Sequence, residues 1–211
     1  MVAGKEKLSA VPVGSDEELM QLVAKGDRKA FDKVYDRYHR QIYNFIKKQV
    51  VQRAAAEDIM QEVFVRLFRS ARRFDPDKQL SSYLYKIAVN EVRRHYQKAS
   101  TSQGFSLNEP LSGEDDTRER IDLMPDERQM PDVQVREEFA RRTLRQLIDR
   151  LPPEQKMVVL LKVYDEMTFE EIAQIMDRPL STVLSRMRYA LQKLRRWMDD
   201  EGITQDELPG N

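Results

Sequence analysis

Hydrophobic residues recur every three or four positions over most of the first hundred residues. Leu19, Leu22 and Val23 begin the pattern, and further groups continue it through residues 31–46 and 59–68. This period places the apolar side chains on one face of a helix, and such a face is stable only when it packs against a neighbour. The pattern therefore predicts several helices around a shared core.

One more helix is expected after a break at residues 75–77 (Asp-Pro-Asp). Ser81 or Ser82 can cap it through a side-chain hydroxyl, and its apolar positions continue to Tyr96. No hairpin dipeptide or alternating strand pattern competes with the helical one. Residues 15–98 are therefore predicted to form an all-helical domain of about four helices.

The second half of the chain begins with a helix that should end near Leu151. Pro152 and Pro153 cannot continue that helix, but they can begin the next one. The next helix carries the uninterrupted apolar run Met157–Leu161. Two consecutive helices are therefore predicted here, with the diproline between them.

A helix-turn-helix is predicted after this pair. Thr168 and Glu171 match the S/T-x-x-E capping box that starts a helix. Residues 177–179 (Asp-Arg-Pro) make the turn, and Ser181 or Thr182 is expected to cap the final helix.

The final helix is both amphipathic and basic. Its apolar positions Val183, Met187, Leu191 and Leu194 are predicted to face the core, and residues 178–198 hold six basic residues and no acidic one. A helix of this kind suits the major groove of DNA, although an ordinary helical hairpin remains an alternative.

Composition narrows the chemistry. The chain has 211 residues, 34% of them charged, and no cysteine, which excludes disulfides and thiolate metal sites and agrees with a reducing compartment. His39 and His95 are the only histidines, and the seven glycines form no phosphate-binding motif. We therefore predict no cofactor, no metal and no catalytic residue.

Two observations bear on location. The longest wholly apolar run, Met157–Leu161, is far shorter than the roughly 20 residues that span a bilayer. The N-terminus also lacks the apolar region of a signal peptide. We expect a soluble, cytoplasmic protein.

The net charge of zero hides a polarised chain. Residues 15–98 carry a net charge of +6 and residues 133–199 carry +3, whereas residues 99–132 carry −6 and residues 200–211 carry −4. Two basic blocks on either side of an acidic spacer favour polyanion binding, with solvated helix faces as the alternative.

These shifts in composition also give the domain boundaries. We expect a disordered N-terminus at 1–14, a helical domain at 15–98, a flexible acidic linker rich in Pro, Ser and Asp at 99–132, a second helical domain at 133–199 and a mobile acidic tail at 200–211. The predicted fold class is all-α, with two small helical domains.

Three segments resemble the extracytoplasmic-function (group IV) sigma factors of bacterial RNA polymerase. Residues 56–68 (AEDIMQEVFVRLF) and 74–98 (FDPDKQLSSYLYKIAVNEVRRHYQK) are similar to domain 2 of that family. Residues 168–196 (TFEEIAQIMDRPLSTVLSRMRYALQKLRR) are similar to its domain 4, the helix-turn-helix. The two motif sets occur in the order that the family has.

The resemblance assigns docking on the clamp helices of the polymerase's largest subunit to Asp58, Gln61, Glu62, Phe64 and Arg66. Asp58, Gln61 and Glu62 are spaced so that they share one helical face. The alternative is a solvated face with an ion pair between Glu62 and Arg66.

Melting and reading of the minus-10 promoter element is assigned by the resemblance to Tyr83, Lys86, Asn90, Arg93 and Arg94. An aromatic ring, cations and an amide are groups that can capture unstacked bases and their backbone. Tyr83 stands where the family commonly has Trp.

Some of these residues also have a structural alternative. Tyr83 and Tyr96 could be partly core, whereas Asn90, Arg93 and Arg94 have little reason to be buried.

The resemblance also implies that the loop at residues 74–79 lines the pocket for a flipped base.

In the second domain, the resemblance assigns readout of the minus-35 element to Arg178, Ser181, Thr182, Ser185, Arg186 and Arg188. The segment departs from the family at Leu184, which can offer only an apolar contact to a base, and at Tyr189, which replaces a frequent Arg.

The function implied is that of a sigma factor, not an enzyme, which directs core polymerase to promoters in a stress response. Its implied partners are the largest-subunit clamp helices, the flap of the second-largest subunit, promoter DNA and an anti-sigma factor, with no direct insertion into a membrane. A stand-alone helix-turn-helix activator or repressor is the first alternative.

An enzyme is the weaker alternative. The adjacent carboxylates Glu57/Asp58 and Glu170/Glu171 point about 100° apart on a helix, so neither pair converges on a substrate.

Overall fold

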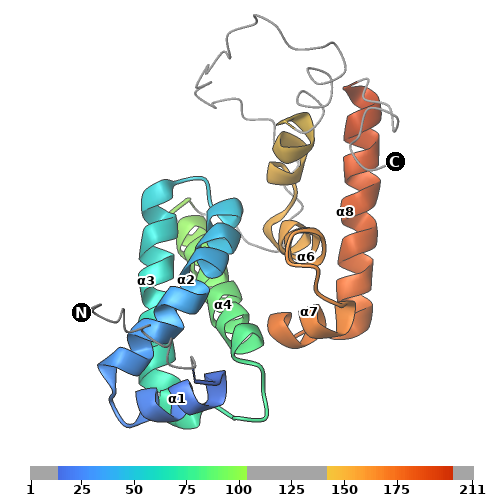
Figure 1. The fold of residues 1–211 in the computed structure, drawn as a ribbon. Coiled ribbons are helices and arrows are strands. Elements are labelled where there is room, and N and C mark those ends of the chain that lie inside the picture. Colours follow the sequence, from blue (N-terminus) through green and yellow to red (C-terminus); the bar gives the residue numbers. More distant parts are fainter. Residues whose placement is uncertain (1–13, 104–141, 202–211) are drawn as a thin grey trace, which may run out of the picture.

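The computed structural model describes residues 14–103 and 142–201, and every regular element within these two ranges is helical (Figure 1). The first domain consists of α1 (Asp16–Ala24), α2 (Arg28–Gln49), α3 (Arg53–Ser70), the 3-10 helix η1 (Ala71–Arg73) and α4 (Leu80–Gln103). The second consists of helical residues 142–149, α6 (Pro153–Val163), α7 (Phe169–Met176) and α8 (Leu180–Asp200). The predicted all-α fold of two helical domains is confirmed.

Several predicted boundaries lie where the sequence places them. α6 begins at Pro153, and Thr168 and Glu171 form a complete capping box at the start of α7. α4 continues to Gln103, five residues past the predicted domain boundary at Lys98. Most of the predicted N-terminal segment, acidic linker and acidic tail lies outside the described residues.

Two predicted helix caps are wrong. α4 begins at Leu80, so Ser81 and Ser82 lie within its first turn. α8 begins at Leu180, and Pro179 occupies the capping position, so Ser181 and Thr182 do not cap the helix. The fixed φ of proline already directs the chain into the helix. The Pro179 carbonyl accepts hydrogen bonds from the backbone amides of Thr182 and Val183, at 2.9 and 3.2 Å.

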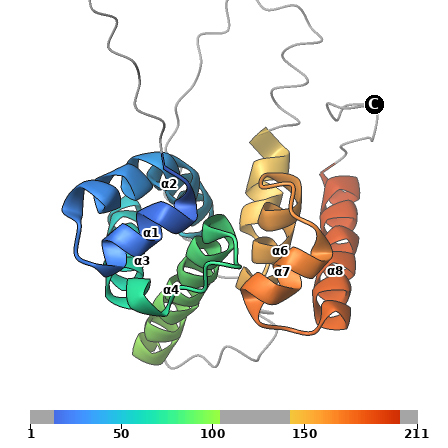
Figure 2. The same ribbon diagram turned by 60° about the horizontal axis from the view of Figure 1, so that its bottom comes forward.

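One hydrophobic core runs through both domains. Buried side chains of α1 to α4 are continuous with Met157, Val158 and Leu161 of α6, with α7, and with Val183 of α8. α7 packs on α4, and α6 packs on α2 (Figure 1, Figure 2). The two domains are therefore joined by burial of apolar surface, which disfavours their separation in water.

The apolar run of α6 is buried on two sides. Met157, Val158 and Leu161 face the core shared with the first domain, while Val159 and Leu160 belong to a second cluster with Leu147, Ile148, Leu151, Ala190 and Leu194. A helix that is apolar around most of its circumference must be buried around most of it. α6 therefore packs at the same time on α2 of the first domain and on α8 of its own domain.

Polar contacts reinforce this contact. The Tyr85 hydroxyl, on a fully buried ring of α4, donates to the Asp165 carboxylate after α6. Burial raises the pKa of Asp165, although Tyr85 and Lys48 oppose the rise. The Lys48 ammonium also lies 3.4 Å from the centre of the Tyr164 ring, a cation–π contact.

One of the residues predicted to face the core, Leu191, does not lie there. Leu191 is 52% exposed, whereas Val183 and Leu194 are buried and Met187 is half-buried. α8 packs on α6 along the side that carries Ala190 and Leu194, so Leu191 faces outward.

Two further features of the described ranges concern membranes and metals. None of their helices is both long and apolar enough to cross a bilayer. Nor do His, Asp and Glu side chains in these ranges gather into a group that could hold a metal ion.

Candidate nucleic-acid interface

Four residues predicted to contact DNA form a stripe along α4. Tyr83, Lys86, Asn90 and Arg94 follow one another at intervals of three, four and four residues, which places them on one helical face. Lys86, Asn90 and Arg94 are exposed. The α4 stripe therefore presents an aromatic edge, two cations and an amide side by side.

Tyr83 is anchored at one end of the stripe. Its ring packs edge-on against Phe74 with centroids 5.4 Å apart, and its hydroxyl donates to the Ser70 hydroxyl at 2.8 Å. The side chain is half-buried, so Tyr83 is both part of the core and part of the surface. Tyr96 also packs against the core, and its hydroxyl donates to the Gln49 carbonyl.

The environment of Arg93 differs from the predicted one. Its side chain is only 16% exposed, and it donates to both carboxylate oxygens of Glu154 in α6, at 2.7 and 3.0 Å. It also donates to the Met176 carbonyl at 2.9 Å. The expectation that Arg93 has little reason to be buried is wrong, because the carboxylate of Glu154 in the second domain balances the charge of its guanidinium group.

The predicted docking face on α3 is largely exposed. Asp58 and Gln61 are exposed, and Glu62 is half-buried beside them. Arg66 forms an ion pair with Glu62 at 2.9 Å, which is the pair named in the alternative of a solvated face. The exposed apolar residue Val65, which the sequence alone does not assign to this face, extends it.

Phe64 does not belong to this exposed face. It is 4% exposed, and its ring contacts those of Phe31 and Tyr35 edge-on, at centroid distances of 6.2 and 4.8 Å. The prediction of Phe64 as an exposed docking residue is wrong, because its side chain is buried and holds α3 on α2.

A buried carboxylate lies between the two faces of the first domain. Glu91 of α4 is 5% exposed and pairs with Arg66 at 2.6 Å and with Arg94 at 3.3 Å. Burial raises the pKa of Glu91, while the charge of Arg66 opposes that rise. Glu91 thus links a residue of the α3 face to a residue of the α4 stripe.

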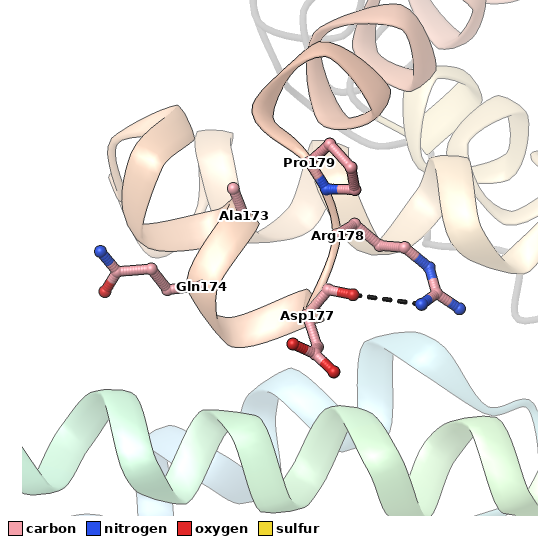
Figure 3. A pocket seen from close by; sticks show the side chains of 5 residues that line it. All are labelled: Ala173, Gln174, Asp177, Arg178 and Pro179. Atoms are coloured by element: carbon pink, nitrogen blue, oxygen red, sulfur yellow. Dashed lines mark hydrogen bonds between the residues drawn. The ribbon is translucent and has the colours of Figure 1, made fainter.

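The helix-turn-helix of the second domain has a tight turn. Asp177 adopts a left-handed conformation (φ 52°), and the Arg178 amide donates to the Ala173 carbonyl at 3.0 Å. These two features form the standard C-terminal cap of a helix. Figure 3 shows the shallow, open depression that Ala173, Gln174, Asp177, Arg178 and Pro179 line at this turn, with α4 running below it.

The residues predicted to read the minus-35 element differ in exposure. Arg178, Ser181 and Arg188 are exposed around the start of α8. Thr182 and Ser185 are half-buried, and the Ser185 hydroxyl donates to the Thr182 carbonyl at 2.9 Å.

Arg186 is not free for DNA. Its side chain is 21% exposed and pairs with the Glu154 carboxylate at 2.7 Å. Burial lowers the pKa of the Arg186 guanidinium, and the charge of Glu154 counters that effect. Arg93 and Arg186, from different domains, thus share the Glu154 carboxylate, a contact that the sequence alone does not predict.

Comparisons with known proteins agree with this division. Residues 34–101 match the family model described as Sigma-70 region 2, and residues 141–194 match Sigma-70, region 4. The chain is 30% identical over 178 residues to the ECF RNA polymerase sigma factor SigW of Bacillus subtilis, with 84% of this chain and 94% of the relative covered. The chain belongs to the ECF sigma factors.

A second relative gives the same result. The ECF RNA polymerase sigma-E factor of Escherichia coli K12 is 30% identical over 177 residues, which cover 82% of this chain and 88% of the relative. Both matches span the two domains of this sigma factor. The sequence-based prediction of a sigma factor that directs RNA polymerase to promoters is therefore confirmed.

Solved structures share the fold. CnrH in complex with the cytosolic domain of CnrY superposes with a TM-score of 0.60 at 20% identity, covering 89% of this chain and 99% of that chain. The sigma factor RpoE of Bartonella quintana, in complex with the anti-sigma factor NepR, gives a TM-score of 0.58 at 18% identity, covering 81% and 98%.

Proposed function

We propose that three helices of this ECF sigma factor divide the work of promoter recognition. The α3 face (Asp58, Gln61, Glu62 and Arg66) binds the clamp helices of the polymerase's largest subunit. The α4 stripe, joined by Arg93, melts and holds the minus-10 element. The start of α8 reads the minus-35 duplex, and the second domain also contacts the flap of the second-largest subunit.

The observation that carries the proposal is the chemistry of the α4 stripe. Bases taken out of a duplex lose stacking worth a few kcal/mol per step, which the protein must offset. The Tyr83 ring can stack on a base, Lys86 and Arg94 can follow the phosphates, and Asn90 offers both a donor and an acceptor to a base edge. Lys86, Asn90 and Arg94 are exposed, and the half-buried Tyr83 lies on the same helical face.

The α3 face suits a protein partner. Its exposed carboxylate and amide groups can accept hydrogen bonds from a partner's arginines. The ion pair between Glu62 and Arg66 holds the Glu62 side chain beside them. Val65, which is 39% exposed, adds apolar area beside them.

The start of α8 suits duplex DNA. Arg178, Ser181 and Arg188 can contact phosphates or base edges, and Leu184, which is 43% exposed, can contact a thymine methyl group. The Arg188 guanidinium lies 5.1 Å from the centre of the exposed Tyr189 ring, and this contact holds it near the helix.

An anti-sigma factor is a further proposed partner. Support comes from the fold: RpoE, which has this fold, is described in complex with the anti-sigma factor NepR.

The decisive experiment is run-off transcription from a cognate promoter with core polymerase, in the presence and absence of the protein. The proposal expects transcripts only when both are present. A stand-alone regulator would instead bind the promoter without polymerase and would not confer initiation on the core enzyme.

A single substitution tests the α4 stripe. Asn90→Ala should impair open-complex formation, measured by permanganate reactivity of unpaired thymines, while leaving core binding unchanged. The matched control is Asn44→Ala on the exposed side of α2. Equal open-complex formation by both variants would exclude Asn90 from the stripe's function, and loss of folding by Asn90→Ala would make Asn90 a structural residue.

A further inference from the structure

We propose that Glu154 is a latch that keeps the free protein closed by occupying DNA-binding arginines of both domains. This inference rests on the proposed function, in which Arg93 joins the α4 stripe, and it adds Arg186 to the residues of α8 that contact the minus-35 duplex. Promoter DNA and Glu154 then compete for the same two guanidinium groups.

The geometry of the latch is specific. Arg93 of α4 donates to both oxygens of Glu154 at 2.7 and 3.0 Å, and Arg186 of α8 pairs with the same carboxylate at 2.7 Å. Two parallel hydrogen bonds between a guanidinium and a carboxylate are the arrangement with which arginine also binds phosphate. Glu154 therefore occupies Arg93 in the manner that a DNA phosphate would.

The electrostatic environment of Glu154 supports this role. Burial alone would raise the pKa of its carboxyl group, yet the hydrogen bonds and charge of Arg93, with the charges of Arg186 and Arg178, bring that pKa below its ordinary 4.5. All three cations are residues predicted to contact DNA. The latch carboxylate is thus ionised at neutral pH and surrounded by promoter-contacting arginines.

Distance makes the closed form incompatible with a whole promoter. The minus-10 and minus-35 elements are roughly 25 base pairs apart, which is on the order of 80 Å along a duplex. In the closed form, Arg93 and Arg186 contact a single carboxylate. Both elements can be bound at once only after the two arginines separate.

Other contacts also hold the domains together, including the shared core and the hydrogen bond from Tyr85 to Asp165. Glu154 differs from these because its removal frees the arginines themselves. Polymerase, which positions each domain separately in the proposed function, would open the latch before DNA is engaged.

The test compares Glu154→Gln with Glu170→Gln in the full-length protein. Each substitution removes one negative charge, and Glu170 lies exposed on α7, so the pair controls for net charge. Because the chain has no cysteine, Gln21→Cys and Gln192→Cys provide one exposed dye site in each domain for energy transfer. The second measurement is the affinity of the free protein for a duplex carrying both promoter elements.

We expect Glu154→Gln to lower energy transfer and to raise the DNA affinity of the free protein by about tenfold over Glu170→Gln, since two charge-assisted contacts are lost. With core polymerase present, both variants should transcribe at the wild-type rate.

Three results would overturn the latch. They are unchanged energy transfer in a folded Glu154→Gln protein, an affinity for DNA equal to that of Glu170→Gln, and reduced transcription by Glu154→Gln holoenzyme, which would place Glu154 in the open complex. Failure of the proposed function is recognised separately, because wild-type protein would then give no run-off transcript.

Discussion

Leu191 and Leu194 lie three residues apart on α8, yet they have opposite environments. Leu194 is 6% exposed and packs with Leu160 and Ala190, whereas Leu191 is 52% exposed. The period of the sequence gives both positions an apolar side chain, but only the packing partner α6 decides which one is buried.

This pair gives a stability prediction at the scale of a residue. Leu194→Ala should lower the free energy of unfolding by about 3 kcal/mol, because it removes buried methyl groups and leaves a cavity. Leu191→Ala, the matched control on the same helix, should cost less than about 1 kcal/mol. Chemical denaturation followed by circular dichroism measures both, and similar losses would contradict the assignment.

The dependence of burial on packing partners also explains which exposures the sequence predicts correctly. Lys86, Asn90 and Arg94 are exposed as expected because local helical spacing places them on one face. Arg93 pairs with Glu154, which is 61 residues away along the chain. A sequence pattern read along the helix carries no information about a partner so distant, so the sequence does not predict this ion pair.

At the scale of an element, the sequence predicts interactions within a few residues of each other. It does not predict how neighbouring residues or packing helices change where a helix begins or which side is buried. The capping box of Thr168 and Glu171 was recognisable because all its atoms lie within four residues. The expected caps Ser181 and Thr182 failed because Pro179 starts α8 earlier. The apolar run of α6 predicts that the helix is buried. It does not predict that one side of the helix packs on the first domain.

The capping box predicts how the stability of α7 depends on pH. Hydrogen bonds from the backbone and side chain of Thr168 hold the pKa of Glu171 below its ordinary 4.5. The contribution of the carboxylate to folding is therefore fully present above pH 4.5 and is lost as the pH falls through the lowered pKa.

We expect Glu171→Gln to lower the free energy of unfolding by about 0.5 kcal/mol at neutral pH and Thr168→Ala to lower it by about 1 kcal/mol. The difference between wild type and Glu171→Gln should disappear in acid below the lowered pKa. Urea denaturation at both pH values measures it, and a difference that persists unchanged in acid would contradict the capping role of the charge.

At the scale of the whole molecule, the sequence predicts two domains but not their association. Composition marks the segment between them, and each domain has its own helical period. The shared core, however, joins helices such as α4 and α7 that only the folded chain brings together.

A shared core predicts that the two domains unfold together. Leu84 is fully buried in the first domain, and the single tryptophan, Trp197, lies on α8 of the second. Leu84→Ala should lower the denaturation midpoint reported by Trp197 fluorescence, by the equivalent of about 3 kcal/mol.

The control for this experiment is Leu22→Ala, since Leu22 is 41% exposed in the same domain. Its effect on the fluorescence midpoint should be small. A fluorescence midpoint that stays at the wild-type value in Leu84→Ala, while circular dichroism shows an earlier transition, would mean that the domains unfold independently.

The carboxylate shared by Arg93 and Arg186 has a consequence for the response to salt. Added ions weaken the attraction that closes the free protein, and they also weaken its binding to DNA by reducing the gain from counterion release. The two effects oppose each other in the wild-type protein, but only the second remains in Glu154→Gln. A plot of log affinity against log salt concentration should therefore be shallower for the free wild-type protein than for the variant, and equal slopes would show that closure does not compete with DNA.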